Sequence, residues 1–83
     1  MKVVQTRTFK RQISKLDDEQ QDILDDIIWE LSLDPTMGQQ RRNRLRRYWF
    51  YDYQDSQGRM QLNYQFNQET LQLCGVFKIS QFI

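Results

Sequence analysis

The sequence predicts a single small α+β domain in which two helices pack on one face of a small antiparallel-rich sheet. Apolar residues recur at helical spacing in two segments of the first half, and apolar and polar residues alternate as in strands in the second half. A chain of 83 residues with 39% hydrophobic content can build one core but is short for two domains. We therefore expect one domain over residues 1–83, with the element order β-α-α-β-β-β.

The N-terminal segment is expected to form a short strand followed by a helix. Val3 and Val4 begin the strand, which ends near residue 6 or 7. Thr8 can serve as the N-cap of the helix. The apolar stripe of this helix consists of Phe9, Ile13 and Leu16.

A second helix is marked at both ends. Asp17 and Gln20 have the spacing of a capping box, which predicts a helix that begins there and ends near Leu33. The stop signal that follows consists of Asp34, Pro35 and Gly38. Because the connection between the helices is short, we expect them to pack as a hairpin.

The remaining chain predicts three strands. Residues 45–53 form an aromatic-rich strand, and residues 54–58 have the composition of a turn. Residues 60–66 alternate strictly between apolar and amide side chains, as in a half-buried strand. After a turn at residues 67–70, residues 71–77 are apolar enough to lie at or near the centre of the sheet.

Charge is strongly segregated along the chain, although the net charge is only +1. Residues 1–16 carry bases and no acids, and residues 17–34 carry acids and no bases. The next segment contains the arginines Arg41, Arg42, Arg44, Arg46 and Arg47. Such a cluster beside aromatic residues suits RNA or another polyanion, because guanidinium groups pair with phosphates in bidentate geometry. The alternative is a solvated loop whose arginines pair with acids of the second helix.

The aromatic run beside these arginines divides between two faces if the strand is regular. Trp49 and Tyr51 share one face, and Tyr48 and Phe50 share the other. One set must belong to the core, and the other can offer a surface on which bases stack. We take Tyr48 and Tyr51, together with Arg41 and Arg42, as candidates for RNA contact.

Several kinds of chemistry are excluded by composition. The chain has no histidine, which excludes Ser-His-Asp and Cys-His nucleophile systems and His-containing zinc sites. Cys74 is the only cysteine, and we interpret it as a small buried residue in a reducing compartment. The acids of the second helix come from one helix alone, so we expect no metal and no cofactor. No apolar run has the length of a membrane span or a signal peptide, so we expect a cytoplasmic protein with no membrane partner.

Nearly the whole chain resembles the RelE/ParE superfamily of type II toxin–antitoxin toxins. The resemblance rests on the segment TFKRQISKLDDEQQDILDDIIWELSLDPTMG, the basic segment after it and three strands. Its most specific pieces are the spacing of Phe9, Ile13 and Leu16, the D-P-x-x-G terminator, and the hairpin LNYQFNQETLQLCGVF. Toxins of the RelE type cut mRNA in the ribosomal A site, and those of the ParE type poison DNA gyrase. Both types are silenced by a cognate antitoxin.

The resemblance implies either activity and does not choose between them. Many relatives have Arg at the position of Gln61 and a His or Tyr near the last strand, where this chain has Phe77, Lys78 and Phe82. Our leading expectation is a metal-independent mRNA endoribonuclease that acts on the ribosome. The residues expected to line its catalytic site are Arg44, Arg46, Arg47, Arg59 and Lys78. A gyrase inhibitor and a catalytically inactive regulator that binds an antitoxin are the alternatives.

Two apolar residues on the acidic side of the second helix suggest a contact with a partner. Trp29 and Leu33 lie one turn apart among the acids of that helix. We expect this pair to help receive a segment of the cognate antitoxin, and the alternative is packing against a loop of the same chain.

Overall fold

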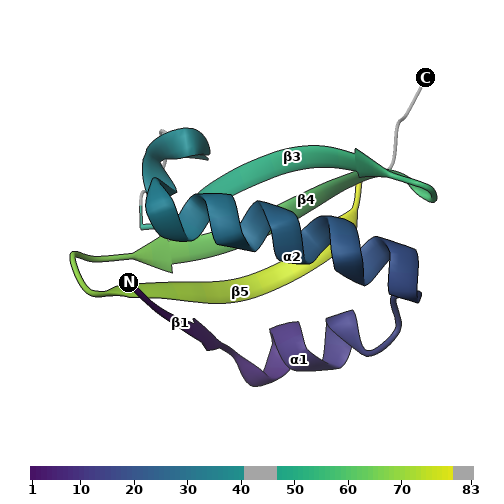
Figure 1. Ribbon diagram of the computed structural model, residues 1–83, viewed down its shortest axis with the longest axis horizontal. Helices are drawn as coiled ribbons and strands as arrows, with labels where there is room; N and C mark the ends of the chain where they lie inside the picture. The colour runs from purple at the N-terminus through teal and green to yellow at the C-terminus, as the bar shows by residue number, and fades with distance from the viewer. Residues whose placement is uncertain (41–46, 80–83) are drawn as a thin grey trace.

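The computed structural model describes residues 1–40 and 47–79, and it has the expected α+β architecture (Figure 1). Two helices cover one face of a five-stranded sheet with the strand order β1-β5-β4-β3-β2. The elements are β1 (Lys2–Gln5), α1 (Arg7–Ile13), α2 (Asp18–Leu33), the short 3-10 helix η1 (Pro35–Met37), β2 (Gln39–Gln40), β3 (Trp49–Asp55), β4 (Gly58–Phe66) and β5 (Thr70–Lys78).

Helix α1 begins two residues earlier than expected, and Thr6 rather than Thr8 is its N-cap. Thr6 Oγ1 accepts a hydrogen bond from the Phe9 amide at 3.1 Å and donates one to the Cys74 carbonyl at 3.1 Å. Thr6 therefore closes the β1–β5 pairing and starts the helix at the same time, which Thr8 could not do. The helix ends at Ile13, although Leu16 still packs against the core.

Helix α2 confirms the capping box and the end near Leu33. Asp17 Oδ1 accepts from the Gln20 amide at 2.8 Å, and Gln20 Oε1 accepts from the Asp17 amide at 3.1 Å. The Gln20 Nε2 group also donates to Asp55 Oδ2 at 3.1 Å, in a buried contact that joins the start of α2 to the end of β3. This side chain thus satisfies a helix end and a buried carboxylate together.

The two helices form the expected hairpin. Gln21 Nε2 donates to the carbonyls of Ile13 and Leu16, each at 3.0 Å, which fixes the end of α1 against the first turn of α2. Both helices contribute to a single core between themselves and the sheet. Its buried apolar members are Phe9, Leu24, Leu31, Met60, Leu62, Tyr64, Leu71, Leu73 and Val76.

The sheet differs from the expectation in two respects. Strand β1 pairs with β5 in parallel, so the sheet is mixed, and the two-residue strand β2 was not foreseen. The chain leaves β1 through α1 and α2 before the antiparallel strands are made, and the last of these, β5, lies beside β1 and runs in the same direction (Figure 1). Strand β5 lies beside the central strand β4, which confirms its expected place near the centre of the sheet.

Strand β5 contains an irregularity opposite β4. Asn63 pairs with Gly75 and Tyr64 pairs with Leu73, so Cys74 has no partner of its own in β4. Beyond this point α1 replaces β1 as the neighbour of β5, since Gln12 Oε1 accepts a hydrogen bond from the Val76 amide at 2.7 Å. The Gln12 side chain therefore takes the place of a neighbouring strand as the hydrogen-bond acceptor for this amide.

Candidate nucleic-acid interface

The face of the sheet that points away from the helices, called here the outer face, carries mainly carboxamide side chains. Its residues follow from the register, because Cα partners point to the same side and successive residues alternate. Gln65 pairs with Gln72, which pairs with Val4, and none of them belongs to the core. Asn63 and Gln61 lie on the same side further along β4. These carboxamides share the outer face with Phe50, Asp52 and Phe77, which the register places on the same side.

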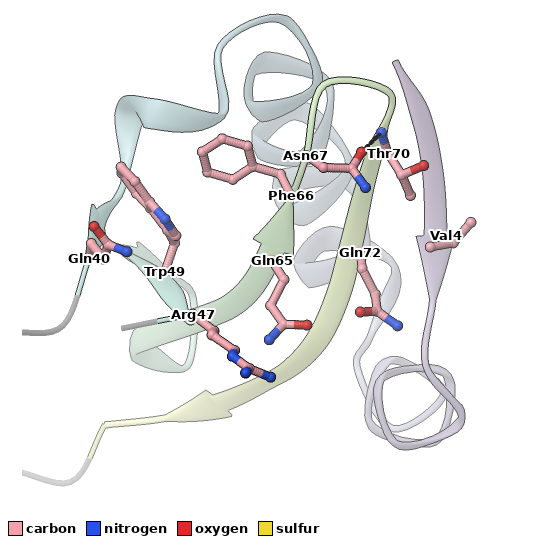
Figure 2. Close-up of a pocket in the computed structure, with 9 residues that line it drawn as sticks. All are labelled: Val4, Gln40, Arg47, Trp49, Gln65, Phe66, Asn67, Thr70 and Gln72. Carbon is pink, nitrogen blue, oxygen red and sulfur yellow. Dashed lines mark hydrogen bonds between the residues drawn. The ribbon is translucent and has the colours of Figure 1, made fainter. Parts of the chain in front are cut away.

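A hollow of about 620 Å³ opens where β3, β4 and β5 meet the segment before β3. It is lined by Val4, Gln40, Arg47, Trp49, Gln65, Phe66, Asn67, Thr70 and Gln72. Figure 2 shows the side chain of Arg47, from the segment before β3, and those of Gln65 and Gln72, from β4 and β5, on the same side of the sheet. The hollow thus combines one guanidinium group with several carboxamides.

Two aromatic residues, Trp49 and Phe66, lie at the edge of this hollow, with their rings on the helix side of the sheet, opposite Gln65 and Gln72 (Figure 2). The ring centroids of Trp49 and Phe66 lie 5.1 Å apart at an interplanar angle of 59°. Both rings also contact Tyr64, at centroid distances of 6.5 Å for Trp49 and 6.2 Å for Phe66. Because Tyr64 is fully buried, the rings of Trp49 and Phe66 are anchored in the core.

The hollow contains residues that the sequence did not single out. Gln65 was interpreted only as one of the alternating amides of residues 60–66, Gln72 was given no role, and Trp49 was interpreted only as a member of the aromatic run. The sequence alone does not give the register between two strands, and that register decides which of their amide side chains become neighbours. The alternation in residues 60–66 indicated on which side of the sheet each amide lies, but it did not indicate which residues of other strands lie beside that amide.

The predicted basic residues fall in different parts of the molecule. Arg41, Arg42, Arg44 and Arg46 lie outside the described residues. Arg47 is exposed and lines the hollow, beside the start of β3. Arg59 and Lys78 lie at the other end of the sheet, where Arg59 pairs with Gln54. The two ends are separated by roughly 17 Å along β3, from Trp49 to Gln54 at about 3.4 Å per residue.

Arg59 and Lys78 also point to opposite sides of the sheet. Lys78 is the Cα partner of Met60, whose side chain is in the core, so Lys78 lies on the helix side. Its Cε atom would be 3.4 Å from a Cβ placed on Gly58, which is on the same side. Arg59 precedes Met60 and therefore points to the outer face. The described residues do not bring Arg47, Arg59 and Lys78 together.

The two candidate tyrosines are likewise separated. Tyr48 is exposed, whereas Tyr51 is half-buried and packs against the core from the helix side. Trp49 and Tyr53 share the side of Tyr51, so this is the set that contributes to the core. Phe50, on the outer face, is half-buried.

The hydroxyl groups of Tyr53 and Tyr64 are held in their protonated form. Burial, with a smaller contribution from Asp55, raises the pKa of Tyr53 to about 12. Burial also raises the pKa of Tyr64 to about 12, although the hydrogen bond from Gly38 opposes the shift. Neither group is suited to accept a proton from a substrate near neutral pH.

The Tyr64 hydroxyl holds the backbone just before the arginine-rich segment. Its hydroxyl donates to the Pro35 carbonyl at 2.6 Å and accepts from the Gly38 amide at 3.1 Å. A Cβ on Gly38 would collide with this hydroxyl and would lie 2.6 Å from the Phe50 carbonyl oxygen. Strand β4 thus fixes the short stretch that joins α2 to the arginine-rich segment.

Gln61 occupies the position at which the resemblance predicts an arginine in many relatives. Its Nε2 group donates to Asp52 Oδ1 at 3.0 Å, across the β3–β4 pair. The side chain is buried, and its Oε1 atom has no hydrogen-bond partner. At this position the outer face therefore presents an amide and a carboxylate rather than a cation.

The predicted partner-binding pair lies on the solvent side of α2. Trp29 and Leu33 are 66% and 69% exposed, which excludes packing against a described loop of the same chain. Met37, in the 3-10 helix that follows, is 42% exposed. The acids of α2 are exposed on the same helix. No group of three or more Cys, Asp or Glu side chains among residues 1–40 and 47–79 is arranged to hold a metal ion.

A family model agrees with this architecture over almost the entire chain. The model of the ParE-like toxins of type II bacterial toxin–antitoxin systems matches residues 3–80. The chain belongs to this family. No curated protein matches the chain closely enough to add a named relative. Within the described part of this ParE-like toxin, no helix has the length and apolar character needed to cross a membrane.

Proposed function

We propose that this ParE-like toxin inhibits translation by binding mRNA on the ribosome and cleaving it, without a metal or a cofactor. The hollow beside Arg47 carries this proposal. It combines, within one open site, a guanidinium group and several carboxamides, with Trp49 and Phe66 at its edge. The toxin family supplies the context, and it implies an antitoxin as the partner that silences the activity.

The chemistry of the hollow suits single-stranded RNA. A guanidinium group pairs with a phosphate, whereas the donor and acceptor of a carboxamide can read the edge of an unpaired base. Gln65 and Gln72 are Cα partners on adjacent strands, so their amides can contact one nucleotide or two successive ones. Tyr48, exposed just before β3, is available for stacking.

Cleavage requires three operations on the RNA. The 2′-hydroxyl loses its proton to a solvent water molecule, the phosphate charge is stabilised, and the leaving oxygen receives a proton from solvent. We assign charge stabilisation to Arg47 together with Arg44 and Arg46, which belong to the same segment. Arg59, on the outer face but remote from Arg47, is assigned to contacts with the flanking RNA. Lys78 points to the helix side and is given no part in this site.

Inhibition of DNA gyrase is the second candidate. The distance between Arg47 and the pair Arg59 and Lys78 favours it, since a toxin that only binds its target needs no convergent catalytic groups. The amide of Gln61, in place of a cation, favours it as well. Under this alternative the outer face and the arginine segment bind gyrase rather than RNA.

A pair of assays separates these candidates. In a reconstituted translation reaction, cleaved mRNA at stoichiometric toxin supports the first proposal, and intact mRNA contradicts it. In a supercoiling assay, accumulation of cleaved DNA selects the gyrase alternative. Normal growth during unopposed expression would indicate an inactive regulator and would contradict both.

Variants of the hollow test the RNA-binding step by itself. Arg47→Ala should reduce the slope of log Kd against log salt for a single-stranded RNA by about 0.7, the value for one phosphate contact. Gln65→Ala and Gln72→Ala should alter base preference and leave this slope unchanged. Arg11→Ala is the matched control, because Arg11 is exposed on α1, away from the outer face. Equal slopes for the Arg47 and Arg11 variants would remove the hollow from the proposal.

A further inference from the structure

The solvent side of α2 has two parts with different chemistry. Taking 100° per residue, Asp22, Asp25 and Asp26 lie within about 60° of Trp29 around the helix axis, and Leu33 lies about 40° away. The buried residues Leu24 and Leu31 lie on the opposite side. The exposed side therefore carries carboxylates along its N-terminal half and apolar side chains along its C-terminal half. We call this stripe, from Asp22 to Leu33, the α2 stripe.

The apolar end of the α2 stripe exposes large hydrophobic side chains to solvent. Trp29 and Leu33 are the two most exposed large hydrophobic residues among those described, at 66% and 69%. Neither has a role in the core, and Ser32 Oγ merely donates to the Trp29 carbonyl at 2.6 Å. Exposed tryptophan is a common anchor of protein interfaces, because its ring buries a large area when a partner covers it.

We infer that the α2 stripe is the docking surface for an amphipathic segment of the antitoxin that carries apolar side chains at one end and Lys or Arg at the other. Charge complementarity selects this occupant. A purely apolar segment would leave the three carboxylates facing low-dielectric surface, whereas basic side chains would pair with them. The polarity of the stripe also sets the orientation, with the apolar anchors over Trp29 and Leu33 and the bases toward Asp22.

The dimensions of the stripe fit one helical segment of the partner. From Asp22 to Leu33 the helix rises about 17 Å at 1.5 Å per residue, which a partner helix of about three turns spans. Apolar side chains at i and i+3 or i+4 of the partner would meet the Trp29–Leu33 pair. The inference depends on membership of a toxin–antitoxin family and not on whether the target is RNA or gyrase.

The test measures binding between the purified toxin and the antitoxin encoded by the neighbouring gene, with no RNA present. Trp29→Ala should weaken binding about 30-fold or more, as expected for an interface anchor. Phe77→Ala, which removes another exposed aromatic ring far from α2, should change the Kd less than 3-fold. An unchanged Kd for the Trp29 variant would overturn the inference.

Charge reversal tests the acidic half independently. Asp25→Lys should slow association and weaken its dependence on salt, whereas Glu69→Lys, in the β4–β5 turn, should not. Both Trp29→Ala and Asp25→Lys alter exposed side chains, so the thermal midpoint should be retained. In cells, Trp29→Ala should remain toxic and escape neutralisation by the antitoxin. A toxin that is dimeric alone, and that Trp29→Ala makes monomeric with antitoxin affinity intact, would assign the stripe to a second copy and overturn the inference.

Discussion

Replacement of Tyr64 by phenylalanine tests whether the core of this toxin holds the segment that leads to the arginines. The change removes one oxygen atom and leaves the ring in place against Trp49 and Phe66. It deletes the hydrogen bond donated to the Pro35 carbonyl at 2.6 Å and the one accepted from the Gly38 amide at 3.1 Å. Gly38 gains no alternative acceptor from the substituted ring.

The magnitude follows from these two bonds. Each contributes about 1 kcal/mol net, and a buried peptide group left without a partner costs about 1–3 kcal/mol. Pro35 and Gly38 are only half-buried, so water can replace part of the loss. We expect Tyr64→Phe to lower the free energy of unfolding by about 2–3 kcal/mol. For a domain of this size, the thermal midpoint should fall by roughly 10–20 °C.

Urea unfolding and amide hydrogen exchange measure the two parts of this expectation. The Gly38 amide should exchange faster in the variant, while the Asp34 amide, bonded to the Glu30 carbonyl at 3.0 Å, should not change. Tyr48→Phe is the control, because Tyr48 is 38% exposed, and it should alter stability by less than about 0.5 kcal/mol. Equal stability of the Tyr64 and Tyr48 variants would refute the reasoning.

Three further predictions concern stability. Gln20→Ala should lower the free energy of unfolding by about 2–3 kcal/mol in urea titrations, because it leaves Asp55 Oδ2 and the Asp17 amide unpaired; a loss below 0.5 kcal/mol would contradict this. Gly58→Ala should cost about 1–3 kcal/mol, since φ at Gly58 is +121°, and Gly75→Ala, where φ is not positive, should cost less. Because folding raises the pKa values of Tyr53 and Tyr64 from 10.0 to about 12, their contribution is present below pH 10 and is lost between pH 10 and 12. Spectroscopic titration of tyrosine should show this loss coincident with unfolding, and Tyr64→Phe should reduce it.

Local signals in the sequence predicted most of the fold. The capping box at Asp17 and Gln20 fixed the start of α2, and the alternation in residues 60–66 identified the central strand. The start of α1 was wrong by two residues because Thr6 is selected by a tertiary contact, its bond to the Cys74 carbonyl. The parallel β1–β5 pair was missed for the same reason, because the residue pattern of a strand does not indicate which distant strand it pairs with.

The candidate site was harder to predict than the fold, because a site depends on which side chains become neighbours. The sequence analysis assigned Arg59 and Lys78 to one site because both are basic. The register places Arg59 on the outer face and Lys78 on the helix side. Conversely, Gln65 and Gln72 became neighbours only through the β4–β5 pairing. Exposure of Trp29 was the exception, since its helical position among acids already predicted a surface location.

The position of Tyr64 links stability to function in this toxin. Its ring belongs to the core and contacts Trp49 at the edge of the hollow, while its hydroxyl fixes the stretch from Pro35 to Gly38. The arginine segment begins at Arg41, directly after β2, and ends at Arg47, which lines the same hollow. Both ends of that segment are therefore attached close to one buried side chain. Loss of the Tyr64 hydroxyl should weaken RNA binding beyond what its effect on the folded fraction explains, and equal affinity of fully folded wild-type and Tyr64→Phe proteins would separate the two roles.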